Sequence, residues 1–310
     1  MNVTERKLQT PVIVTFANQK GGVGKTTLCA TFANFLVTMG VKVLVIDCDF
    51  QHSIVKRREV DIRKYGEQNL PYEVVGHDAN DRDAVVSLMD KLRNDPSIDV
   101  VLMDSPGSLK ASGLTTMFAN SDYLVIPFHY DVTTIPSTAT FLMFINRLQE
   151  FVRDMDTRLI MVPNMNDGRV GKKVELTLWE KTRETFARYG LVTEKIPKRA
   201  DMERISTMAC LDMQASIVKP VFTTIYREIF GTDEPYRPVV LSGIQLTKNL
   251  KTPEKEEVRE EPVEADAGSL KPESKPMQES LSEMSGNEPE VKEEKEVNTT
   301  TSEKPNTTGP

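Results

Sequence analysis

The chain has 310 residues and a formal net charge of -7, from 39 Lys and Arg against 46 Asp and Glu. Eight of these basic and 16 of these acidic residues follow residue 250, so residues 1–250 are close to neutral, with 31 basic and 30 acidic residues. Three cysteines without paired spacing argue against a disulfide framework or a zinc site, and the lack of a signal-peptide core or an apolar run of about 18 residues favours a cytoplasmic protein without membrane contact.

Short apolar, β-branched segments alternate with amphipathic ones along most of the chain. We expect buried strands at 11–17, 41–47, 72–75, 98–104, 123–128 and 158–164. Helical patterns lie between several of them, at 26–40, 82–95 and 138–154. Alternation of this kind predicts βαβ units, and near-continuous apolar strands are typical of a sheet that is covered on both faces. The predicted fold class is therefore α/β, a doubly wound, mostly parallel sheet with helices on both faces.

The composition changes near residue 247 to Glu, Lys, Pro, Ser and Thr. Such a segment cannot bury enough apolar surface to offset the entropy lost on ordering. The predicted organisation is an N-terminal extension at 1–9, one domain at 10–246 and a disordered acidic tail at 247–310.

The segment NQKGGVGKTT, residues 18–27, follows the first expected strand and opens the first expected helix. Glycines allow backbone N–H groups to approach phosphates, and a helix N-terminus favours negative charge. In this pattern Lys25 contacts the β- and γ-phosphates and the Thr26 hydroxyl coordinates Mg²⁺. The expected phosphate-binding residues are Gly21, Gly22, Val23, Gly24, Lys25, Thr26 and Thr27.

Three aspartates lie at the ends of two of the expected strands. Asp47 and Asp49 project to the same side of the 41–47 strand end, toward the crevice where open α/β sheets bind ligands. We expect Asp47 to support Mg²⁺ or the loop, with capping of the next helix as an open alternative. Asp104 ends the 98–104 strand, where a Walker B carboxylate holds Mg²⁺.

The loop departs from the general G-x-x-x-x-G-K-[ST] pattern, because Gln19 occupies the first glycine position and Lys20 follows it. KGGVGKTT resembles the deviant Walker A loop of the ParA/MinD family of ATPases. The segments IDCDFQHS, VVLMDSPGS and VPNMNDGR resemble further motifs of that family. The resemblance covers about residues 10–230, and it is strongest to the short ParA-type partition ATPases of plasmids and conjugative elements.

This resemblance implies roles for individual residues. Lys20 would reach the phosphates of a partner subunit in an ATP-sandwich homodimer, as an arginine finger does. Asp49 would orient or activate the attacking water, and Asn164 would bind adenine unless it is only a turn residue. Phe50 replaces the family's usual proline, which puts the geometry of that segment in doubt.

The resemblance also implies ATP and Mg²⁺ as cofactors and weak ATP hydrolysis, stimulated by a ParB-like or conjugation-machinery partner. The ATP-bound dimer would bind DNA non-specifically, associate with the nucleoid and drive segregation or maintenance of a plasmid, conjugative element or chromosome region. The alternative is an ATP-gated binding module that recruits a partner to DNA or a conjugation complex with little turnover.

Two groups of basic residues could form a DNA-binding face, although each could equally be a solvated surface. They are Arg169, Lys172 and Lys173, and then Lys195, Lys198, Arg199 and Arg204. His52, His77 and His129 match no metal-site spacing, and we interpret them as ordinary surface or packing residues.

Overall fold

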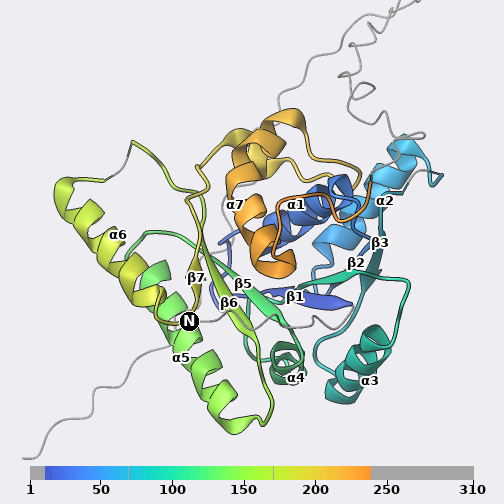
Figure 1. Ribbon diagram of the computed structural model, residues 1–310, viewed down its shortest axis with the longest axis horizontal. Helices are drawn as coiled ribbons and strands as arrows, with labels where there is room; N and C mark the ends of the chain where they lie inside the picture. The colour runs from blue at the N-terminus through green and yellow to red at the C-terminus, as the bar shows by residue number, and fades with distance from the viewer. Residues whose placement is uncertain (1–10, 69, 170, 239–310) are drawn as a thin grey trace, which may run out of the picture. The chain divides into compact units, whose positions relative to one another are not determined.

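The computed structural model describes residues 11–68, 70–169 and 171–238 (Figure 1). The predicted extension at 1–9 and tail at 247–310 lie outside these residues. Strands and helices alternate along the described chain, as predicted. The elements are β1 (Val12–Phe16), α1 (Lys25–Thr38), β2 (Val43–Asp47), α2 (Ser53–Tyr65), β3 (Glu73–Gly76), α3 (Arg82–Arg93), β4 (Val100–Asp104), α4 (Leu114–Ala119), β5 (Tyr123–Phe128), α5 (Thr134–Phe151), β6 (Arg158–Pro163), α6 (Lys173–Phe186), β7 (Leu191–Val192), the 3₁₀ helix η1 (Ala200–Glu203) and α7 (Asp212–Phe230).

The described strands form one sheet in the order β3-β2-β4-β1-β5-β6-β7, and every neighbouring pair is parallel. The six strands expected from the sequence are all present, and β7 is an additional two-residue strand at the edge. The predicted doubly wound parallel sheet is confirmed.

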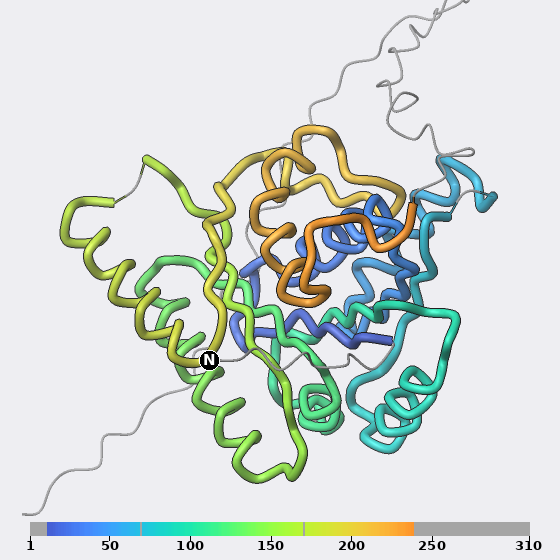
Figure 2. Tube along the Cα trace, in the orientation of Figure 1, coloured from blue at the N-terminus to red at the C-terminus, as the bar shows by residue number. Residues whose placement is uncertain are grey.

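Helices cover both faces of the sheet (Figures 1 and 2). Alternate residues of β1 divide between two apolar cores, with Val14 and Phe16 on one face and Ile13 on the other. The first core includes side chains of α1, α2 and α7, and the second includes side chains of α3, α4, α5 and α6. Of the helices in the described part of the chain, none is long and apolar enough to cross a membrane.

The carboxyl ends of the central strands lie side by side. Asp104 of β4 pairs in register with Phe16 of β1 and with Asp47 of β2. From β1 the chain runs outward through β2 to β3, and it then returns to β4 and passes β1 to reach β5. The connections that leave β1 and β4, which are neighbours, therefore run in opposite directions along the sheet. Ligands of doubly wound sheets bind beyond the strand ends at such a point. The sheet therefore brings the glycine-rich loop and both aspartates to the same edge.

Candidate nucleotide-binding site

The loop between β1 and α1 has the backbone conformation of an anion cradle. Gly22 and Gly24 have φ angles of 76° and 95°, in the left-handed region that glycine adopts without steric cost. Helix α1 then begins at Lys25, and no side chain in the described part of the chain caps its N-terminus. Free N–H groups at a helix N-terminus attract phosphate, so the loop and α1 together provide a phosphate site.

Two residues at the start of the loop tie it to the neighbouring strand and helix. The Asn18 side chain is buried and donates to the Pro127 carbonyl (2.8 Å) and to the Thr138 hydroxyl (2.9 Å). Its Oδ1 accepts the Lys20 N–H at 3.1 Å. Gln19 donates through Nε2 to the carbonyl of Ser137 at 2.8 Å. Sequence reasoning did not identify these anchoring contacts, because their partners lie in β5 and α5.

Thr26 and Asp104, both predicted to hold Mg²⁺, are in direct contact. The Thr26 hydroxyl donates to Asp104 Oδ2 at 2.7 Å. Asp104 is fully buried, and its Oδ1 has no hydrogen-bond partner among the described residues. Burial raises the pKa of Asp104 to about 7, although the Thr26 hydrogen bond opposes this shift.

Lys25 supplies positive charge beside this carboxylate. Its side chain is only 7% exposed. Burial lowers the pKa of Lys25, whereas the nearby Asp104 and Asp49 carboxylates oppose that shift. Its ammonium group lies near the β4 end, 3.6 Å from the position that a Cβ on Gly107 would occupy.

These residues fit Mg²⁺ and a nucleoside triphosphate. A hydroxyl and an unsatisfied, buried carboxylate oxygen are the hard oxygen ligands that Mg²⁺ prefers. Lys25 and the α1 N-terminus would bind the phosphates, and the metal would neutralise part of the phosphate charge. The metal roles of Thr26 and Asp104 remain predictions.

The raised pKa of Asp104 predicts a pH-dependent stability in the nucleotide-free protein. Between the ordinary value of 3.8 and about 7, the folded state keeps a proton that the unfolded state releases. Stability should therefore fall as pH rises through this window, by up to about 1.4 kcal/mol per pH unit, and should level off above pH 7. Thermal denaturation at pH 5, 6 and 7.5 would measure this decline, which Asp104→Asn should reduce, while the raised pKa of Asp47 contributes in the same direction. Parallel pH profiles for the two proteins would contradict this prediction.

Asp47 caps the helix that follows it. Its Oδ2 accepts the N–H groups of Ile54 (2.8 Å) and Val55 (3.2 Å) at the start of α2. Its Oδ1 accepts the N–H of Asp49 at 3.3 Å. Burial raises the pKa of Asp47, and the backbone N–H groups of Val55 and Ile54 oppose this shift. The structure thus shows the contacts expected of the capping alternative, while a contribution of Asp47 to Mg²⁺ binding stays a prediction.

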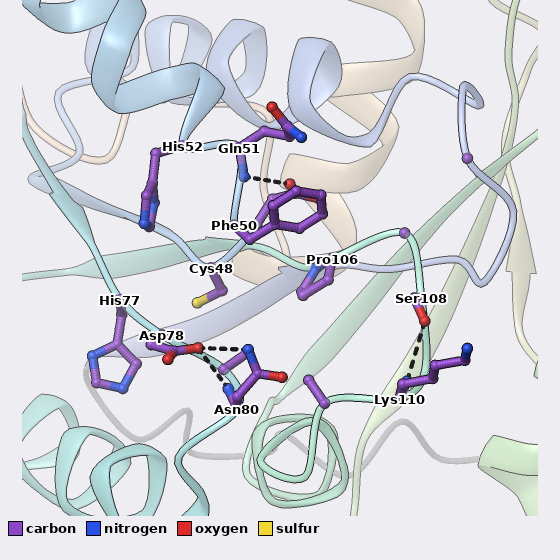
Figure 3. A pocket seen from close by; sticks show the side chains of 15 residues that line it. Cys48, Phe50, Gln51, His52, His77, Asp78, Asn80, Pro106, Ser108 and Lys110 are labelled. Atoms are coloured by element: carbon purple, nitrogen blue, oxygen red, sulfur yellow. Dashed lines mark hydrogen bonds between the residues drawn. The ribbon is translucent and has the colours of Figure 1, made fainter.

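A cavity of about 610 Å³ opens beside the phosphate loop (Figure 3). Its walls are the segments that follow β2, β3 and β4, and Gly21 of the loop also contributes. Asp49 lies in this wall, and its Oδ1 accepts the N–H of Gln51 at 2.9 Å. Phe50, at the position of the family's proline, is 75% exposed. The cavity borders the expected position of the γ-phosphate because Gly107, near the Lys25 ammonium group, also lines it.

Two histidines without a recognisable motif also line this cavity, where Figure 3 places them opposite Pro106 and Ser108. His52 has a left-handed backbone with φ 47°, and its ring packs on Gly76. His52 Nδ1 and His77 Nε2 are buried without hydrogen-bond partners in the described part of the chain. Sequence reasoning had assigned them no place near the site, since they follow different strands and share no motif spacing.

Asn164 lies against the phosphate loop. It follows β6, and its Nδ2 donates to the Val23 carbonyl at 2.9 Å. The structure therefore places Asn164 beside the second half of the glycine-rich loop. Its predicted contact with adenine remains a prediction.

Known proteins share this sequence pattern and fold. The chain is 27% identical over 187 residues to the chromosome-partitioning ATPase Soj of Thermus thermophilus. The aligned residues make up 53% of this chain and 74% of Soj. A plasmid partition protein from Borrelia burgdorferi has the same fold, with a TM-score of 0.53, 20% identity and coverage of 71% of this chain and 99% of that one. An ATP complex of a McdA variant from Cyanothece gives a TM-score of 0.54 at 19% identity, covering 71% of this chain and 96% of that one.

The family assignment rests on a longer match. Residues 14–215 match the family described as the CobQ/CobB/MinD/ParA nucleotide binding domain. This range includes the phosphate loop, both strand-end aspartates and Asn164. The resemblance to ParA/MinD ATPases expected from the loop is confirmed, and the chain belongs to the CobQ/CobB/MinD/ParA nucleotide-binding domain family.

Proposed function

We propose that this chain is a ParA-like ATPase that cycles between a monomer and an ATP-sandwich homodimer. The ATP-bound dimer binds DNA without sequence preference and associates with the nucleoid of the cytoplasm. Slow hydrolysis, stimulated by a ParB-like or conjugation-machinery partner, resets the monomer. The cycle serves segregation or maintenance of a plasmid, conjugative element or chromosome region.

The second lysine of the loop carries this proposal. Lys25 is buried inside the cradle, whereas Lys20 is half-buried and precedes the exposed Gly21 and Gly22 at the outer edge. The Lys20 backbone is held by Asn18, and no hydrogen bond or ion pair involving the Lys20 side chain is found in the described part of the chain. These positions support a division of roles, in which Lys25 binds the chain's own phosphates and Lys20 binds those of a facing subunit.

The names of similar proteins support the biological role. Soj is a chromosome-partitioning ATPase, and the Borrelia burgdorferi protein of the same fold is a plasmid partition protein. The relation to Soj extends over 74% of that protein. We assign the same class of activity to this chain, with DNA as the molecule that is moved or as the surface to which the dimer binds.

The experiment that tests this proposal compares three nucleotide states. Light scattering coupled to size exclusion, and DNA binding measured by fluorescence anisotropy, would be recorded with ATP, with ADP and without nucleotide. We expect a dimer and DNA binding only with ATP. Equal DNA affinity in all three states, or no binding at low salt, would contradict the partition cycle.

The exposed basic residues after β7 are candidates for the DNA contact, as are the exposed Lys172 and Lys173. Lys198, Arg199 and Arg204 are exposed and surround η1. Lys195 instead packs over the Tyr130 and Trp179 rings, with its ammonium 5.1 and 5.2 Å from their centroids. It is therefore less available to a phosphate than its neighbours.

Arg169, in the other basic group, is exposed but already paired. It donates from Nε and Nη2 to the two oxygens of Asp167, at 3.0 and 2.8 Å. This pairing offsets much of its charge toward DNA. It therefore provides a matched control for the basic residues beside η1.

Replacing Lys198 and Arg199 together by alanine is expected to weaken ATP-dependent DNA binding and leave ATP affinity unchanged. Each lost phosphate contact should reduce the slope of log K against log [salt] by about one unit, and the dimer doubles the effect. Salt titrations of DNA affinity would measure the slope. Arg169→Ala should change it less, and an equal effect of the two changes would contradict this assignment of the DNA face.

The second candidate is an ATP-gated binding module with little turnover. The half-buried position of Lys20 is equally compatible with it, because assembly through Lys20 does not require turnover. Phosphate release with and without DNA distinguishes the two. A chain that dimerises and binds DNA with ATP but shows no hydrolysis, even with DNA, would support the binding module.

A further inference from the structure

Asn164 connects two segments that are far apart in the sequence. It follows β6, and its backbone N–H donates to the Phe128 carbonyl at 2.7 Å, which fixes it against β5. Its side chain is buried, and Nδ2 donates to the carbonyl of Val23 across 141 sequence positions. The hydrogen bond thus joins a rigid strand end to the second half of the phosphate loop.

The Asn164 side chain also occupies the space where a side chain on Gly24 would lie. A Cβ on Gly24 would lie 2.3 Å from Asn164 Nδ2, which is well inside van der Waals contact. Gly24 also has a φ angle of 95°, which disfavours any residue with a Cβ. The last turn of the loop therefore rests directly on Asn164.

The geometry of the peptide bond gives this contact a consequence for phosphate binding. The Val23 carbonyl and the Gly24 N–H belong to one planar unit, and in a trans peptide they point in opposite directions. A donor that holds the carbonyl toward Asn164 therefore turns the Gly24 N–H away from Asn164, the direction in which this inference places the phosphates. A donor oriented before the ligand arrives binds it without the cost of reorganisation.

We propose that Asn164 is a positioning residue of the phosphate loop, which acts on the triphosphate by its Nδ2 through the Val23–Gly24 peptide, independently of any contact of its Oδ1 with the base. This inference rests only on the nucleotide-binding part of the proposed function. A chain that binds ATP but neither dimerises nor binds DNA would defeat the partition cycle and leave the following measurement unaffected.

The test compares ligands with and without the adenine base. Isothermal titration calorimetry would measure the affinity of wild type, Asn164→Ala and Asn164→Asp for three Mg²⁺ complexes: ATP, inosine triphosphate and inorganic tripolyphosphate. We expect Asn164→Ala to lose about tenfold in affinity for all three, the usual effect of one hydrogen bond. Asn164→Asp should lose at least as much, since it removes the N–H donor and sets an oxygen against the Val23 carbonyl.

Controls separate this role from general destabilisation. Asn146→Ala, on the exposed side of α5, removes an asparagine that bonds only Glu150 among the described residues and should change none of the affinities. In calorimetry an inactive fraction lowers the binding stoichiometry and leaves the affinity of the folded fraction unchanged, so it does not mimic an equal loss of affinity. If Asn164→Ala is poorly folded, Asn164→Ser gives the same ratios with a smaller loss of packing.

Two results would overturn the proposal. A loss confined to ATP, with unchanged affinity for tripolyphosphate and inosine triphosphate, would identify Asn164 as a base contact only. Unchanged affinity for all three ligands would show that the Val23 hydrogen bond does not govern the loop. An equal loss across the three ligands would establish the positioning role.

Discussion

Replacing Lys25 by alanine is expected to lower the affinity for Mg²⁺-ATP by at least about a hundredfold. Lys25 is the buried cation of the phosphate cradle, at the start of α1. A charge-assisted hydrogen bond contributes about 1.5–3 kcal/mol, so losing its contacts with two phosphates corresponds to a factor of this size or larger. The dipole of α1 and the loop N–H groups remain, but they cannot replace a full charge.

Titration calorimetry of the Lys25→Ala variant with Mg²⁺-ATP would measure the loss. Lys42→Ala is the matched control, because Lys42 is exposed ahead of β2 and its hydrogen bonds with Asp99 and Val100 use its backbone N–H and carbonyl. It should bind ATP as wild type does. Affinity of Lys25→Ala within error of wild type would contradict the phosphate-loop assignment.

Replacing Asp49 by alanine is expected to preserve ATP binding and to slow turnover by about a hundredfold to ten-thousandfold. Asp49 lies in the cavity wall beside the expected γ-phosphate, and one of its oxygens is held by the Gln51 N–H. This leaves its Oδ2 available to orient the attacking water. Without hydrolysis, the ATP-bound dimer should accumulate.

Replacing Lys20 by alanine should give the opposite assembly state, because the variant binds ATP through an intact cradle but lacks the cation that contacts the partner's phosphates. Phosphate release and light scattering with ATP would compare the two variants. Asp78→Ala, at an exposed carboxylate of the same cavity, should keep both turnover and assembly. Identical behaviour of the Asp49 and Lys20 variants would contradict the trans-acting lysine.

The six longest strands and the phosphate loop could be predicted because their signals are local. An apolar run such as 98–104 is buried on both faces wherever it lies in the sheet, and the result is β4. The loop glycines precede a helix that starts at Lys25, as the GKT pattern predicts. In contrast, β7 consists only of Leu191 and Val192, too short to produce a periodic pattern.

The cavity histidines show what local patterns leave out. His52 follows β2 and His77 follows β3, and both reach one cavity only because these strands are neighbours in the sheet. The strand order depends on how the helical connections pack against the sheet, and no residue spacing in the sequence predicts it. A pair of histidines brought together in this way has no motif.

By itself, the sequence determined the fold class, the family and the position of the glycine-rich loop, since strand burial, glycine conformation and helix initiation depend on neighbouring residues. It also placed Asp47 and Asn164 at strand ends, but only the tertiary structure decided what they touch. Asp47 bonds the N-terminus of α2, and Asn164 bonds the Val23 carbonyl across 141 positions. Such partners are set by strand order and by the packing of the loop against β6, because a buried polar group bonds whichever donor or acceptor the assembled sheet places within its reach.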